Sequence, residues 1–131
     1  MAPLSDETLG RLKREDLAWC TTVRPDGSPH TTPVWFCYLE DTWWIASAAR
    51  NVKVRNLATN PHLSLALQDG AAPAVAEGRA TVHTEAFPAA VVAAFAAKYT
   101  GWDITDHRPD GLRVLLQVTV SRWLLAGGAG S

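Results

Sequence analysis

Residues 17–38 read LAWCTTVRPDGSPHTTPVWFCY, and this stretch determines the kind of fold we expect. Side chains alternate along Leu17–Val23, which is typical of a β-strand. Arg24–Ser28 supplies a tight turn, because its proline presets φ and its glycine accepts the left-handed conformation. Pro29–Tyr38 is rich in Thr, Val, Trp and Phe. The sequence therefore predicts a hairpin of two antiparallel strands.

Four more strands are expected after the hairpin, which gives six in all. They are expected at Thr42–Ala48, His62–Gln68, Val75–Thr84 and Leu112–Leu125. Gly78 interrupts one of them, which is typical of a β-bulge or a close approach of another backbone. Tight turns between strands favour an antiparallel barrel or sandwich over a doubly wound sheet.

Two or three helices complete the prediction. A short one follows the N-cap Ser5, and Arg50–Asn60 places apolar residues at helical spacing before the Asn-Pro stop. In Glu85–Tyr99 an aromatic or valine recurs every four residues on an alanine-rich background, and Gly101 supplies the C-terminal signal. We expect a mainly β protein with a single domain over residues 1–125 and a disordered Gly/Ala-rich tail over 126–131.

Composition narrows the class of protein. The 131 residues carry 12 basic and 13 acidic side chains, so no global charge attracts nucleic acid or a membrane surface. Neither a signal sequence nor a membrane-spanning run is evident, and a cytoplasmic location is expected. Cys20 and Cys37 lie in strand-like runs and are predicted to be reduced core thiols.

The segment Ser47–Leu57 holds the main candidate binding site. On a helix, Arg50 and Lys53 lie about 60° apart, so both cations can reach one anion. Free N–H groups at the helix start and the Ser47 hydroxyl would complete a phosphate cradle. Arg55 points about 140° away from Arg50 and would serve another part of the ligand or a partner subunit. Asn56 belongs to the same candidate segment.

Other interpretations of these residues remain open. The basic segment can be an ordinary solvated helix face. Tryptophan beside basic residues can also bind single-stranded nucleic acid, although the balanced charge and the short basic run argue against it. The four histidines lack metal-ligand spacing, and no nucleophile elbow is present, so neither a metal site nor a Ser–His–Asp hydrolase is predicted. The sequence does not indicate which residue would be the catalytic group.

The order of these motifs resembles a known family. Val23–Phe36, Arg50–Leu57 with Asn60-Pro61, Val75–Ala80 and Arg113–Leu116 are similar to successive segments of the pyridoxamine 5'-phosphate oxidase-like superfamily. The resemblance extends over roughly residues 5–125. It implies a split β-barrel homodimer with two cofactor sites at the dimer interface. The chain is most similar to short actinobacterial members, many of which use coenzyme F420 rather than FMN, and it lacks the C-terminal basic motif of true pyridoxamine phosphate oxidases.

The resemblance also assigns roles to residues. Lys53 and Arg50 would hold the cofactor phosphate, and the strand Thr31, Thr32, Pro33 and Val34, continuing to Trp35, would line the ring. The implied function is hydride transfer between F420, or alternatively FMN, and a small unsaturated organic substrate. A non-catalytic flavin- or haem-binding protein, or a structural dimer with an empty groove, are the alternatives.

Overall fold

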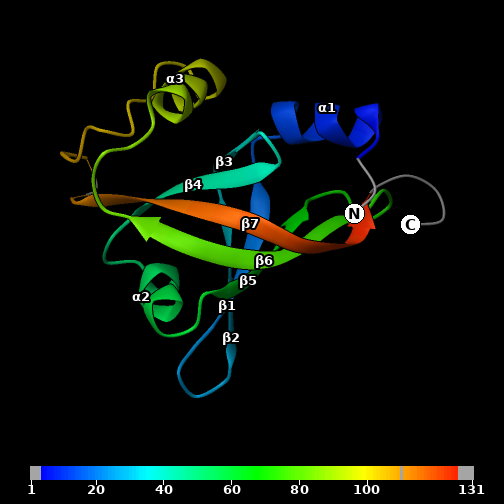
Figure 1. Ribbon diagram of the computed structural model, residues 1–131, viewed down its shortest axis with the longest axis horizontal. Coiled ribbons are helices and arrows are strands. Elements are labelled where there is room, and N and C mark those ends of the chain that lie inside the picture. Colours follow the sequence, from blue (N-terminus) through cyan, green and yellow to red (C-terminus); the bar gives the residue numbers. More distant parts are fainter. Residues whose placement is uncertain (1–3, 110, 127–131) are drawn as a thin grey trace.

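The computed structural model describes residues 4–109 and 111–126, which form a curled antiparallel sheet and three helices (Figure 1). The helices are α1 (Asp6–Arg14), α2 (Val52–Thr59) and α3 (Ala89–Lys98). The strands are β1 (Ala18–Val23), β2 (Pro29–Val34), β3 (Phe36–Leu39), β4 (Thr42–Ala48), β5 (His62–Leu67), β6 (Ala74–His83) and β7 (Arg113–Ala126). Strand β7 ends one residue later than expected, and the remainder of the predicted tail, 127–131, lies outside the described residues.

The sheet has seven strands, so the prediction of six was wrong. The predicted strand Pro29–Tyr38 divides at Trp35 into β2, which pairs with β1, and β3, which pairs with β4. The strand order β2-β1-β5-β6-β7-β4-β3 puts these two halves at opposite edges of the sheet. Because neighbouring Cα atoms lie only about 3.8 Å apart, one connecting residue can join the two edges only if the sheet curls into a barrel-like form.

The interior of the curled sheet holds the larger hydrophobic core. Phe36, Trp43 and Leu65 are fully buried there. Helix α1 contributes Leu12, and α2 contributes Val54 and Leu57. Figure 1 shows these two helices on opposite sides of the strands. Their apolar faces therefore close the interior from two directions.

A second, smaller core lies on the outward face of β3, β4 and β7, where α3 packs. Trp44 and Leu115 alternate with inward-facing neighbours and meet Val91 and Phe95 of α3. The helix begins at Ala89 rather than at Glu85, because Ala86 has a φ of 56° and the chain turns before Pro88. This layer positions the C-terminal end of α3, and thus Tyr99, against the junction of β2 and β3.

The predicted irregularity at Gly78 is confirmed. The register between β6 and β7 shifts between Glu77 and Gly78. A Cβ atom at Gly78 would collide with the backbone carbonyl of Thr119, so only glycine allows this close approach of the two strands.

Candidate functional site

An open cleft of about 610 Å³ lies where the β2–β3 junction faces the end of β4 and the start of α2. Its third side is the loop that leads into β7. Six of the predicted site residues line this cleft together: Pro33, Val34, Trp35, Ser47, Arg50 and Lys53. The curled sheet thus brings together the two segments that the family resemblance assigns to the phosphate and to the ring of one cofactor.

Lys53 is a largely enclosed cation of the cleft. Its side chain is 8% exposed, since the neighbouring Val54 and Leu57 of α2 are anchored in the core. Burial lowers the pKa of its ammonium group, and the nearby Cys20 opposes this in part. Within residues 4–109 and 111–126, the ammonium group has no hydrogen-bond or ion-pair partner. A buried cation without a counter-ion favours an anionic ligand.

The start of α2 opens onto the same cleft. Asn51, the N-cap residue, makes no capping bond with its side chain; its Nδ2 instead donates to Ser47 Oγ at 2.8 Å. This bond leaves the Ser47 hydroxyl proton available to a ligand. Both residues line the cleft, so the positive end of the helix dipole adds to the charge of Lys53.

Two arginines give the cleft further positive charge. Arg113 is only 1% exposed; its guanidinium group donates to the carbonyl of Asp106 at 2.8 Å and lies 5.0 Å from the centre of the Trp102 ring. Arg50 is exposed at the cleft, near Gly111. Among the described residues that line the cleft, none is acidic. The described lining therefore carries three cationic side chains and no acidic one, whereas basic and acidic residues nearly balance over the whole chain.

Aromatic rings form the opposite wall. The Trp35 indole stacks on Tyr99 and meets Trp102 edge to face, with ring centres 5.2 Å apart. Trp35 is still 45% exposed, which is high for a tryptophan with two ring contacts. Trp102, Pro109 and Arg113 also line the cleft but were not predicted, because they come from a loop and a strand that approach it only in the folded chain. Asn51 lines the cleft as well; it lies within the predicted segment Ser47–Leu57 but was not singled out.

Four predicted site residues lie outside the cleft lining. Thr31 faces outward and shares a 2.8 Å hydrogen bond with Thr21, whereas Thr32 faces inward with a buried Oγ1 that has no partner among the described residues. Arg55 is exposed on another side of α2. Asn56 is buried, and its Nδ2 donates to Thr22 Oγ1 at 3.0 Å. Asn56 therefore ties α2 to β1.

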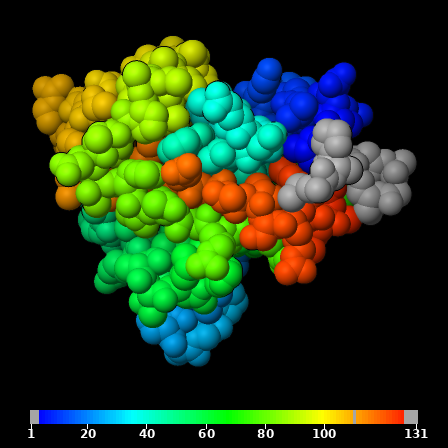
Figure 2. Space-filling model, in the orientation of Figure 1, coloured from blue at the N-terminus to red at the C-terminus, as the bar shows by residue number. Residues whose placement is uncertain are grey.

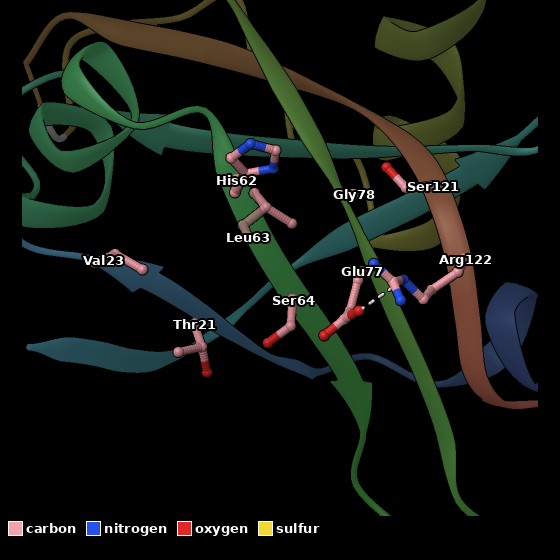
Figure 3. Close-up of a pocket in the computed structure, with 9 residues that line it drawn as sticks. All are labelled: Thr21, Val23, His62, Leu63, Ser64, Glu77, Gly78, Ser121 and Arg122. Carbon is pink, nitrogen blue, oxygen red and sulfur yellow. Dashed lines mark ion pairs between the residues drawn. The ribbon is translucent and has the colours of Figure 1, made fainter. Parts of the chain in front are cut away.

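A second hollow, of about 340 Å³, lies on the outward face of β1, β5, β6 and β7 (Figure 3). Thr21, Ser64, Glu77 and Arg122 stand opposite one another in the strand register and form one polar row. Figure 3 shows Arg122 reaching back to Glu77, and their charged groups are 3.1 Å apart. On the same face Trp19 is 43% exposed.

The cysteines and histidines form no alternative centre. Cys20 and Cys37 are free and buried, and burial raises the pKa of the two thiols to about 12 and about 11. Among the residues that the structure describes, no group of three or more His, Cys, Asp or Glu side chains could hold a metal ion. The same part of the chain contains no helix that is long and apolar enough to cross a membrane.

Residues 4–126 match a protein family described as Pyridoxamine 5'-phosphate oxidase. A comparison with curated proteins gives no match. Among solved structures, one described as an F420 reductase has a TM-score of 0.72 at 22% identity, covering 93% of this chain and 98% of that one.

Two other solved structures have a similar fold. A conserved hypothetical protein, Rv2991, from Mycobacterium tuberculosis has a TM-score of 0.73 at 23% identity, covering 92% of this chain and 83% of that one. HutZ, a haem storage protein from Vibrio cholerae, has a TM-score of 0.75 at 16% identity, covering 94% of both chains. At these identities the likeness concerns the fold.

Proposed function

The chain belongs to the pyridoxamine 5'-phosphate oxidase family, and we propose that it is an oxidoreductase that uses coenzyme F420 or, alternatively, FMN. It transfers a hydride between this cofactor and a small unsaturated organic substrate. One observation carries the proposal: a single cleft joins Lys53, a buried residue whose ammonium group has no partner among the described residues, to an aromatic wall at Trp35. A planar ring with a phosphate-bearing tail matches both parts.

The residues present fit the phosphate end of such a cofactor. Lys53 supplies a charge whose burial goes uncompensated among the described residues, and a phosphate would compensate it. The Ser47 hydroxyl and the first N–H groups of α2 supply donors beside it. Arg50 adds a second cation at the cleft.

The other side of the cleft fits a planar ring. Pro33 and Val34 offer an apolar strand surface, and Trp35 continues it with an indole. A bound deazaflavin or flavin would supply the hydride chemistry, while these side chains orient the ring and exclude water. No carboxylic acid, histidine or tyrosine lines the cleft among the described residues, so the proton of the overall reaction is assigned to solvent.

We favour F420 over FMN. Beyond its phosphate, the tail of F420 continues into carboxylate groups, whereas FMN ends at the phosphate. Arg50 and Arg113 line the cleft in addition to Lys53, and guanidinium groups are donors that pair well with carboxylates of the longer tail.

We further propose that the protein works as a homodimer through the outward face drawn in Figure 3. Pro33 lines the cleft and stands opposite Trp19 in the β1–β2 register, so the cleft opens beside this face. An exposed tryptophan next to a row of hydroxyl and charged groups is suited to a protein interface, where aromatic residues are enriched. A second copy seated there would cover the mouth of the cleft and add to the cofactor site.

A second candidate function is the storage or sensing of a planar ligand without turnover. The absence of an acid–base side chain from the described cleft lining favours it, as does the structural likeness to a haem storage protein. Under this alternative the protein binds the ligand but transfers no hydride to a substrate.

Titration of the cofactor-free protein with F420 and, separately, with FMN tests the proposal, with tryptophan fluorescence as the signal. We expect saturable quenching by F420, weaker quenching by FMN, and a dimer mass by light scattering. Binding of neither compound would refute the proposed cofactor. Tight binding of haem alone would favour the storage function.

A further inference from the structure

A third hollow, of about 340 Å³, adjoins the cleft at Trp35. It is lined by Asp16, Leu17, Trp35, Lys98, Tyr99 and Thr100. Trp35 is common to both linings, so its exposed indole stands between them. A molecule with its reacting part at the cleft can extend past this indole into the hollow.

The walls of this hollow are held in place. Tyr99 Oη accepts a hydrogen bond from Phe36 N at 2.8 Å and lies 2.9 Å from the carbonyl oxygens of Asp16 and Phe36. Its ring in turn supports the Trp35 indole. Because the rings are fixed before any ligand arrives, binding here would order few side chains.

Most of the hydrogen-bonding capacity of Lys98 is used within the protein. Its Nζ donates to the carbonyls of Phe36 at 2.8 Å and Leu12 at 3.3 Å, and it lies 3.8 Å from the centre of the Phe36 ring. Lys98 therefore stabilises the protein here and has little capacity left for a ligand.

Two polar groups of the hollow remain open. Asp16 and Thr100 are exposed, and the carboxylate and the hydroxyl have no hydrogen-bond partner among residues 4–109 and 111–126, although the carboxylate also interacts electrostatically with the Lys98 ammonium group. Thr100 also has a φ of 50°, which is unusual for a β-branched residue and places its side chain at the rim. A carboxylate accepts hydrogen bonds and donates none. A ligand that complements the hollow therefore has an N–H donor next to an apolar or aromatic group.

We propose that this hollow is a substrate subsite that binds an aromatic group carrying an amine, while the reacting part of the same substrate occupies the cleft. This assignment rests on the proposed function and names the substrate class: planar, unsaturated and amine-bearing. The aromatic group packs against Trp35 and Leu17, and the amine donates to the carboxylate of Asp16. Binding energy from this remote group would position the reacting part of the substrate.

The test uses the whole chain without cofactor, so that it does not depend on the cofactor proposal. Three probes share one ring and differ in charge: 2-phenylethylamine, 2-phenylethanol and phenylacetate. Binding is followed from backbone amide shifts of residues 16, 17 and 99–101 in two-dimensional NMR spectra. The variants are Asp16→Asn and, as a matched control, Asp41→Asn, which removes a carboxylate from an exposed turn with a φ of 61° that asparagine tolerates.

We expect the amine to give saturable shifts at these residues in the wild type and in Asp41→Asn, and the phenylacetate to give none. Asp16→Asn should weaken amine binding about threefold to fivefold, as for an exposed ion pair. Equal binding of all three probes, no binding of any, or an unchanged affinity in Asp16→Asn would overturn the subsite. Failure of F420 and FMN to bind while the amine still does would instead refute only the cofactor proposal.

Discussion

The indole of Trp35 lies almost parallel to the ring of Tyr99, with ring centres 4.6 Å apart and planes 7° from parallel. Trp35 joins the two edge strands of the sheet, and Tyr99 follows directly after α3. The same contact therefore packs the end of α3 against the β2–β3 junction and forms one wall of the cleft. In Figure 2 the segment that follows α3, coloured gold, lies next to α3 at one end of the molecule.

The Tyr99 hydroxyl is predicted to stabilise this junction. Tyr99→Phe keeps the stacked ring but leaves the backbone N–H of Phe36 without its partner. The free energy of unfolding should fall by about 1–3 kcal/mol, the range for an unsatisfied buried donor. Urea denaturation measures it. Tyr38→Phe is the control, since the Tyr38 hydroxyl has no partner among the described residues, and its variant should unfold close to the wild type. Equal effects of the two substitutions would contradict this role.

Gly78 is predicted to be irreplaceable for a steric reason. Gly78→Ala would press a methyl group against the Thr119 carbonyl and force β6 away from β7. We expect a loss of about 1–3 kcal/mol in the free energy of unfolding, as for an overpacked site. Gly70→Ala is the matched control, because a Cβ there meets nothing within 4 Å. A thermal melt in which both variants behave alike would argue against the close contact.

Cofactor affinity is predicted to fall at alkaline pH through Lys53. Burial lowers its pKa, so the ammonium group loses its proton at a lower pH than an exposed lysine, whose pKa is about 10.4. Affinity for a phosphate-bearing cofactor should decline as the pH rises through that lowered pKa. Lys53→Arg, with a guanidinium group that stays charged, should remove the decline. Fluorescence titrations at increasing pH give the cofactor affinity of the two proteins. An equal decline of affinity with pH in both would exclude Lys53 as the titrating group.

The two thiols are predicted to react slowly in the folded protein. Burial raises the pKa of Cys20 to about 12 and that of Cys37 to about 11, so the reactive thiolate is scarce near neutral pH. A chromogenic disulfide reagent should modify both quickly in denaturant and slowly without it. Rapid modification of the native protein would show that one of these strands opens readily.

The sequence was sufficient to predict the hairpin, most strand positions and the irregularity at Gly78, because alternation and turn residues are local signals. The division of Pro29–Tyr38 was not predictable in this way. The β-forming composition of that stretch continues across Trp35, whereas the break arises because its two halves pair with different strands. Six strands were therefore predicted where the structure has seven.

The site residues, like the strands, could be predicted where the signal is local in the sequence and not where it depends on contacts between distant segments. Arg50 and Lys53 could be found because they lie on one short segment. Arg113 could not, since a charged residue at the start of a strand usually faces solvent, and its burial depends on carbonyl groups of the preceding loop. Thr31 and Thr32 were proposed together, but adjacent strand residues point to opposite faces of the sheet.

The central claim is that the cleft holds the phosphate-bearing tail of a cofactor through Lys53. The most direct measurement is the dissociation constant of F420 for Lys53→Ala and Arg55→Ala, side by side with the wild type. Both variants remove one cation from α2, but Lys53 lines the cleft and Arg55 is exposed away from it. We expect Lys53→Ala to weaken binding by about 1.5–3 kcal/mol and Arg55→Ala to leave it unchanged. Equal affinities of all three proteins, or a loss confined to Arg55→Ala, would contradict the account.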